Sequence, residues 1–218
     1  MDQQIINLYD EYTHKPLPRS EFMKRLAILT GSTAAAVAIL PFLEGNYAKA
    51  AVTPSDDLFT EYITYPAVTG EMKAYVARPK KEAAYGTIVV IHENRGLNAH
   101  IEDVARRAAK AGFLAIAPNA LAPLGGTPAN EDEARTLFTK LNQQETQTNF
   151  INIFNYLKTR KDSNGKFGCV GFCWGGGMAN TLAVNVPDLK AAVAFYGRQA
   201  AVADVPKIKA AVQLHYAA

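Results

Sequence analysis

The most constraining stretch of the sequence is residues 166–177, where an apolar run ends in Gly-Phe-Cys-Trp-Gly and continues into further glycines. This order of residues predicts a β-strand, a very tight turn and the first turn of a helix. In the related pattern Gly-x-Ser-x-Gly, the flanking glycines are needed because the nucleophile has a strained backbone and the strand and helix pack closely behind it. Cys173 occupies the serine position here. The stretch therefore predicts a nucleophile elbow with a cysteine at its apex.

Length and composition restrict the class of protein. The 218 residues are 49% apolar, which is enough for a sizeable core and favours one folded domain. The net charge of +3 is small, and no basic face or low-complexity tail suggests a nucleic-acid partner. Cys169 and Cys173 lie on the predicted strand and its turn, about 13 Å apart between Cα atoms at the rise of a strand. A disulfide needs less than about 7 Å, so the cysteines do not imply an oxidising compartment.

The first fifty residues differ from the rest and are predicted to be an N-terminal leader. Residues 19–25 are basic, residues 26–43 are almost wholly apolar, and Ala-Lys-Ala at 48–50 has the small-residue spacing of a signal-peptidase site. We therefore expect export to the periplasm. The basic part resembles a twin-arginine signal, except that Ser20 stands where the second arginine belongs. The alternative is an N-terminal helix of a cytoplasmic protein.

Stable membrane insertion of this leader is not expected. The apolar segment is about eighteen residues long, which is marginal for a membrane-spanning helix. It is also interrupted by Gly31, Ser32 and Thr33.

Residues 51–218 have the pattern of a folded α/β domain. Residues 61–65 and 72–78 predict an antiparallel hairpin, and the continuous apolar run 86–91 predicts a strand buried on both faces of a parallel sheet. Further strands are predicted at residues 113–118, 166–172, 191–195 and 210–215, and a turn at 162–165. Helices are expected between Asn98 and Gly112, from about residue 131, over residues 143–158 and directly after the elbow, with Met178 and Leu182 on one face. This alternation predicts an open, mostly parallel sheet with helices on both faces.

Polar residues follow two of the predicted strands. His-Glu-Asn-Arg at 92–95 comes directly after the buried strand 86–91, and Cys173 and Trp174 follow strand 166–172. In open α/β sheets, ligands bind beyond the carboxyl ends of the strands. We therefore expect Glu93 and Cys173 to belong to one site.

Three segments resemble a known family. Residues 90–98, Val-Ile-His-Glu-Asn-Arg-Gly-Leu-Asn, residues 111–118 and residues 171–176 are similar, in order and spacing, to the dienelactone hydrolase (carboxymethylenebutenolidase) family of the α/β-hydrolase fold. The resemblance extends from about residue 61 to the C-terminus. It implies hydrolysis of a small-molecule enol-lactone or related ester through a thiol-ester intermediate, with no metal or organic cofactor. It does not predict the oligomeric state.

The resemblance also implies roles for individual residues. Cys173 matches the nucleophile, and Glu93 matches a glutamate that contacts the resting cysteine and takes part in its activation. The backbone N–H groups of Trp174 and Asn94 match the oxyanion hole. General chemistry agrees, because the thiolate is the reactive form of cysteine and a helix N-terminus favours its negative charge.

Two arginines are candidates for holding a substrate carboxylate, as arginines do in the family. Arg135 lies near the matching place and Arg95 is an alternative, but ordinary surface charge explains either equally well.

For other residues, a purely structural explanation is the alternative to a functional one. Glu93 could be a solvated loop carboxylate. His92 fits a packed strand-end histidine better than a base, and Cys169 fits the core. His14 and His100 have no partners at metal-ligand spacing, so no metal site is expected.

The end of the sequence departs from the family. The family's catalytic triad runs from nucleophile to acid to histidine, and both partners follow the strand matched by residues 212–216. Asp204 precedes that strand and His215 lies within it, so neither is expected to reach Cys173. The resemblance thus implies a C-terminally truncated domain that lacks its last strand and helix, with an exposed sheet edge. The second hypothesis is therefore a non-catalytic remnant of such an enzyme; a carboxylate-binding scaffold without turnover has no supporting feature.

Overall fold

The computed structural model describes residues 2–14, 17–43, 53–68 and 70–216, and the chain divides into two compact units, Met1–Ala50 and Ala51–Ala218. The first unit contains the helices α1 (Gln3–His14), α2 (Arg19–Thr30) and α3 (Thr33–Leu43). Its own small core includes Tyr12 and Phe22, whose rings stack with centroids 4.1 Å apart. The candidate cleavage segment, residues 48–50, lies outside the described residues.

The apolar segment 26–43 is divided between α2 and α3. Gly31 ends α2 with a φ of 82°, and the two helices meet at 108°. In the described part of the chain, no one helix has the length and apolar character that a membrane span requires, although α2 and α3 meet the requirement when they are taken together.

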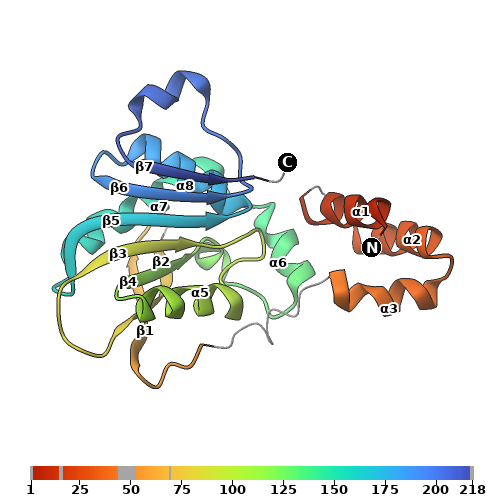
Figure 1. The fold of residues 1–218 in the computed structure, drawn as a ribbon, viewed down its shortest axis with the longest axis horizontal. Helices are drawn as coiled ribbons and strands as arrows, with labels where there is room; N and C mark the ends of the chain where they lie inside the picture. Colours follow the sequence, from red (N-terminus) through yellow and green to blue (C-terminus); the bar gives the residue numbers. More distant parts are fainter. Residues whose placement is uncertain (1, 15–16, 44–52, 69, 217–218) are drawn as a thin grey trace. The chain divides into compact units, whose positions relative to one another are not determined.

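The second unit is built on a seven-stranded sheet in the order β1-β2-β4-β3-β5-β6-β7 (Figure 1). The strands are β1 (Leu58–Pro66), β2 (Glu71–Pro79), β3 (Tyr85–Ile91), β4 (Leu114–Asn119), β5 (Ser163–Phe172), β6 (Leu189–Phe195) and β7 (Ala211–His215). β1 pairs with β2 and β2 with β4 in antiparallel fashion, and the remaining neighbours are parallel. The predicted lead-in hairpin and mostly parallel sheet are therefore confirmed.

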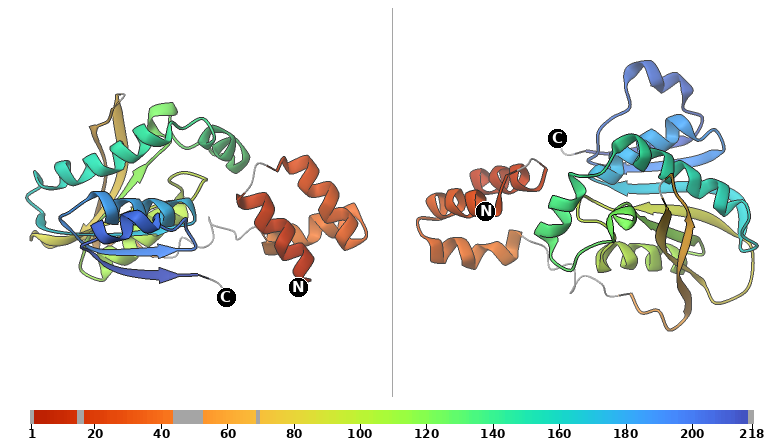
Figure 2. Two further views of the ribbon diagram at one scale, coloured as in Figure 1. Left: turned by 90° about the horizontal axis from the view of Figure 1, so that it is seen from above. Right: turned by 180° about the vertical axis from the view of Figure 1, so that it is seen from behind.

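Helices cover both faces of this sheet, as Figure 2 shows from above and behind. On one face, α5 (Ala99–Lys110) packs Ile101 and Ala105 against alternate residues of the central strands. On the other, α7 (Gln143–Leu157) and α8 (Trp174–Asn185) bury Phe150, Ile153 and Leu182 in the larger core. α6 (Glu131–Phe138) and the short 3₁₀ helices η1 (Ala122–Leu124) and η2 (Val202–Lys207) lie in the connections.

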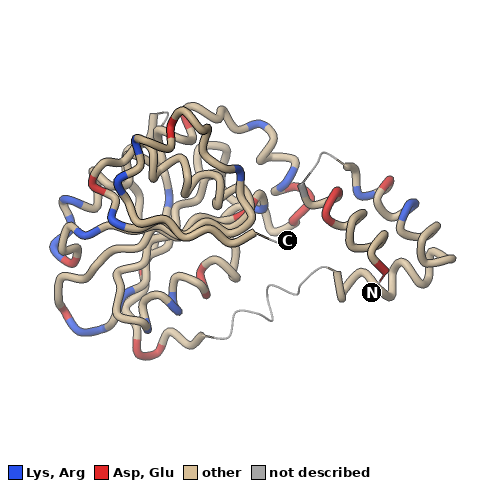
Figure 3. The backbone as a smooth tube through the Cα atoms, turned by 45° about the horizontal axis from the view of Figure 1, so that its top comes forward, with Lys and Arg blue, Asp and Glu red and all other residues tan. Residues whose placement is uncertain are grey.

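Helix starts follow the expected capping chemistry. The Asn98 side chain accepts a hydrogen bond from the Ile101 N–H at 3.1 Å, which satisfies one of the open donors of the first turn of α5. Asn130 and Asn142 cap α6 and α7 in the same way. Figure 3 shows acidic and basic residues of the second unit distributed over its loops, helices and strand ends.

One boundary differs from the prediction. The expected turn at 162–165 is in part the start of β5, which begins at Ser163. The Tyr85 N–H donates to the Asp162 carbonyl at 2.9 Å, and the hydroxyls of Thr87 and Ser163 lie 3.0 Å apart. These contacts with β3 extend the strand through a segment whose composition favours a turn.

Candidate active site

Cys173 lies at the apex of a sharp turn between β5 and α8. Its backbone has φ 56° and ψ −117°, a conformation that costs a non-glycine residue of the order of 1–3 kcal/mol. A Cβ at Gly171 would overlap the Gly175 carbonyl, and a Cβ at Gly175 would overlap the carbonyl oxygens of Ile91 and His92. The flanking glycines are therefore required by close backbone packing, as the elbow pattern predicts.

The sheet register places Cys173 between two other strand-end residues. Ile91 of β3 is level with Gly171 of β5, and Phe172 of β5 is level with Phe195 of β6. Continuing the register past the strand ends puts Glu93, Cys173 and Tyr196 in one row across β3, β5 and β6. The Cys173 N–H donates to the Phe195 carbonyl at 3.0 Å, which holds the elbow against β6.

The Glu93 carboxylate is held by the third member of this row. Its Oε1 accepts a hydrogen bond from the Tyr196 hydroxyl at 2.9 Å. Its Oε2 is buried and has no hydrogen-bond partner among the described residues. A buried carboxylate oxygen without a donor is costly, so this oxygen is an open acceptor within the site.

His92 is a packed strand-end histidine, as the sequence predicts. Its ring is fully buried, its Nε2 accepts from the Ala120 N–H at 3.0 Å, and its Nδ1 contacts the Glu93 carbonyl oxygen. Burial lowers the pKa of His92 to about 4. Both nitrogens are thus used to fix the loop after β3, and the ring remains neutral near pH 7.

Trp174 forms one wall of the elbow. Its ring stacks on His92 at 5.6 Å between centroids and contacts Phe138 and Phe150 edge-on. Its backbone N–H is in the first turn of α8, where N–H groups lack partners within the helix. Asn94 lies in the tight loop that the Gly96 N–H closes on the Glu93 carbonyl at 3.3 Å. The two predicted oxyanion donors therefore stand at the ends of the adjacent strands β5 and β3.

Comparison with known proteins agrees with the α/β fold. The model of the dienelactone hydrolase family matches residues 72–218. The chain belongs to the dienelactone hydrolase family. A solved structure from Klebsiella pneumoniae subsp. pneumoniae MGH 78578, titled "Putative Dienelactone Hydrolase", superposes with a TM-score of 0.62 at 27% identity, over 72% of this chain and 71% of that one.

Two relatives from Escherichia coli (strain K12) are similar in sequence. "Putative hydrolase fragment YghX" is 45% identical over 119 residues, which are 52% of this chain and 98% of that protein. "Putative carboxymethylenebutenolidase" is 33% identical over 151 residues, 67% of this chain and 55% of that protein. The chain thus spans about half the length of the carboxymethylenebutenolidases that it matches.

The two arginines proposed as carboxylate clamps both have acidic partners within the chain. Arg95 is buried, and its Nε lies 3.0 Å from Glu131 of α6. Arg135 lies 3.5 Å from Asp132 on the same helix. In this dienelactone hydrolase family member, either arginine would have to exchange its partner to hold a substrate.

A cavity of about 740 Å³ lies beside the elbow helix. Its walls include Phe138, Trp174, Met178 and Thr181, and the loop after β6 contributes Arg198 and Lys207. Neither Tyr196 nor Arg198 was predicted from the sequence. Tyr196 follows β6 directly, just as Cys173 follows β5, so the strand-end rule applied to a third strand would have found it.

Asp204 and His215 lie where the sequence predicts, before β7 and within it. Asp204 forms an ion pair with Lys207 at 2.7 Å. The His215 ring stacks on Phe195 at 4.3 Å, and Phe195 in turn stacks on Phe172. Phe172 packs with the α5 side of the core, so His215 belongs to a ring stack on that face of the sheet.

Proposed function

We propose that the protein is a hydrolase of small esters or lactones in which Cys173 Sγ attacks the carbonyl carbon and Glu93 takes up the thiol proton. The observation that carries the proposal is the row of strand-end residues, in which a strained cysteine at a helix N-terminus adjoins a glutamate with one open, buried carboxylate oxygen. An enol-lactone is the substrate class that the family name indicates.

The reaction proceeds in two stages. As the S–C bond forms, the thiol proton passes to Glu93 Oε2, and the carbonyl oxygen becomes an oxyanion that accepts hydrogen bonds from the Trp174 and Asn94 N–H groups. Collapse of this intermediate breaks the C–O bond, and the leaving oxygen takes the proton from Glu93. Water then hydrolyses the thiol ester, its hydroxyl going to the acyl carbon and its remaining proton to the sulfur.

Turnover should be slow. A well-placed general base contributes about 10² to 10⁴ in rate. Among the described residues, the Asp204 carboxylate is paired with Lys207, His215 is stacked on Phe195, and both nitrogens of His92 are engaged. These contacts favour a second candidate, a family scaffold in which Cys173 is acylated but not regenerated at a useful rate.

Hydrolysis of p-nitrophenyl acetate and of dihydrocoumarin tests the proposal. We expect slow hydrolysis by the purified protein that falls to the uncatalysed rate in Cys173→Ala. Cys169→Ala is the matched control, because Cys169 is buried in β5 four residues earlier, and it should keep the wild-type rate. Equal hydrolysis by wild type and Cys173→Ala would refute the cysteine mechanism.

A further inference from the structure

Backbone strain is concentrated at two adjacent positions. Among the described residues, the non-glycine residues with positive φ are Cys173, at 56°, and Tyr196, at 39°. They are neighbours across β5 and β6 in the strand-end row. Such conformations persist only where the surroundings fix them, and they concentrate at functional sites. The nucleophile elbow accounts for the strain at Cys173 but not for that at Tyr196.

The backbone around Tyr196 is fixed on both sides. Its N–H donates to the His215 carbonyl of β7 at 2.8 Å. The next residue, Gly197, lies against the first turn of α8, where a Cβ would overlap the backbone of Gly176 and Gly177. Tyr196 therefore projects from a rigid base formed by β6, β7 and the elbow helix.

From this base the Tyr196 side chain reaches across the elbow. Its hydroxyl donates to Glu93 Oε1 at 2.9 Å. In the sheet, β5 lies between β3 and β6 (Figure 1). Cys173, which follows β5, therefore lies between Glu93, which follows β3, and Tyr196, which follows β6. Neighbouring strands are about 4.8 Å apart, so this hydrogen bond joins strand ends about 10 Å apart, across the position of Cys173.

The hydrogen bond from Tyr196 also determines which Glu93 carboxylate oxygen has no hydrogen-bond partner among the described residues. Because Tyr196 occupies Oε1, the oxygen without a partner is Oε2, which is buried. The Glu93 side chain is partly exposed, and removal of the Tyr196 hydroxyl would take away the hydrogen bond to its Oε1, so that the side chain would gain rotamer freedom.

We propose that Tyr196 is a positioning residue that holds the Glu93 carboxylate across the elbow, in the row of strand-end residues that includes Cys173. The inference rests on the roles proposed above for Cys173 and Glu93 and adds a third residue to that site. It predicts that Tyr196 influences Cys173 only through Glu93.

The pH dependence of Cys173 alkylation by iodoacetamide, followed by peptide mass spectrometry, tests this without any substrate turnover. Cys169 is buried, which raises its pKa to about 12, so it serves as an unreactive reference in the same protein. A carboxylate near a thiol opposes formation of the thiolate because like charges repel. In Tyr196→Phe the carboxylate moves away, and the alkylation midpoint should fall by about 0.5 to 1 pH unit.

Matched variants separate positioning from general structural effects. Tyr216→Phe is the control, because Tyr216 is one strand further along the row, is 42% exposed against 47% for Tyr196, and donates at 2.7 Å to a backbone carbonyl. It should keep the wild-type midpoint. Glu93→Gln should lower the midpoint, and adding Tyr196→Phe to it should cause no further change.

Two outcomes would overturn the inference: a wild-type midpoint in Tyr196→Phe, or a shift of the same size in the Glu93→Gln background. Thermal unfolding of each variant checks that the fold is kept. The same experiments distinguish failure of this inference from failure of the proposed function. If the protein does not hydrolyse esters but Tyr196→Phe shifts the midpoint only when Glu93 is present, the hydrolase is refuted and the positioning role stands. If the protein hydrolyses esters but the Tyr196→Phe shift does not depend on Glu93, the positioning role is refuted and the hydrolase stands.

Discussion

His92 directly precedes Glu93 and is fully buried, so its role is structural. Its ring is enclosed by Trp174, Phe138 and Phe150, and a backbone N–H occupies its acceptor nitrogen. A charged imidazole in this position would lose the Ala120 hydrogen bond and its hydration. The neutral form is therefore required by the native fold.

The low pKa of His92 makes stability depend on pH. The unfolded chain binds a proton near pH 6.5 and the folded chain only near pH 4, so stability is complete above 6.5 and falls as the pH drops towards 4. The full loss is about 3 kcal/mol for 2.5 pH units. Urea unfolding between pH 7 and pH 4 should show this slope in wild type and in His100→Gln, but not in His92→Gln. An unchanged slope in His92→Gln would contradict the assignment.

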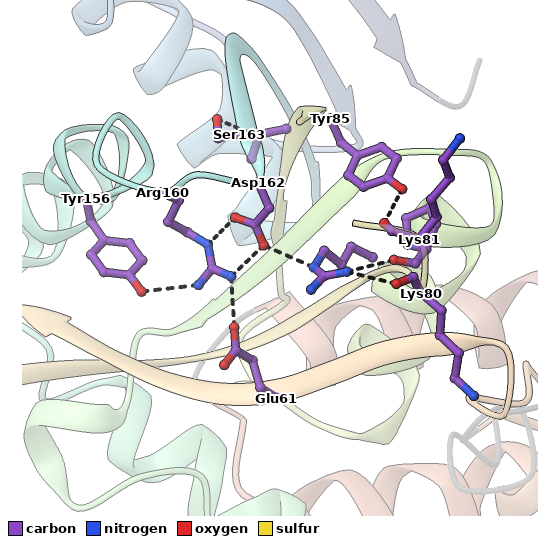
Figure 4. A network of polar contacts seen from close by, with 11 residues as sticks. Glu61, Lys80, Lys81, Tyr85, Tyr156, Arg160, Asp162 and Ser163 are labelled. Atoms are coloured by element: carbon purple, nitrogen blue, oxygen red, sulfur yellow. Dashed lines mark hydrogen bonds and ion pairs between the residues drawn. The ribbon is translucent and has the colours of Figure 1, made fainter. Parts of the chain in front are cut away.

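At the scale of elements, a network of charges holds the sheet at the end opposite the elbow (Figure 4). Arg160, after α7, donates to both oxygens of Asp162 and to Glu61 of β1, each at 2.8 Å. Arg78 of β2 contacts Asp162 at 3.1 Å. These ion pairs lower the pKa of Asp162, with the Arg160 hydrogen bond as the main cause. One carboxylate thus links the edge hairpin to the start of β5.

Removal of this carboxylate should destabilise the fold. Asp162→Ala leaves two arginines without their shared partner, and because the site is only partly buried we expect a loss of about 2–3 kcal/mol, below the range for fully buried pairs. Asp188→Ala is the matched control, since the Asp188–Lys158 pair has a similar 2.7 Å distance but is exposed. Chemical unfolding should show a clear decrease for Asp162→Ala and almost none for the control. Equal effects would mean that the network contributes little.

At the scale of the molecule, the order of strands and helices along the chain could be predicted from the sequence. Alternating apolar runs predicted the hairpin and the parallel strands, and the rule for strand ends brought Glu93 and Cys173 to one edge. It could not supply the register between β3, β5 and β6, which depends on tertiary pairing and which places Tyr196 against Glu93. For the same reason it could not foresee that Arg95 and Arg135 have acidic partners from α6.

The edge of the sheet is also a property of the whole unit. β7 is the last strand in the order, and all five of its residues are exposed, including Val212 and Leu214. An exposed apolar edge strand is prone to pairing with other chains. Functional assays should therefore be made at low protein concentration.

The most direct test of the account is the acyl adduct on the elbow. Brief reaction with p-nitrophenyl acetate, acid quenching and peptide mass spectrometry should find one acetyl group on Cys173 and none on Cys169. The adduct should form within the burst of p-nitrophenol and disappear slowly as the thiol ester is hydrolysed. An unmodified Cys173, or acetylation that is equal on the buried Cys169, would contradict the central claim that the elbow cysteine is the nucleophile.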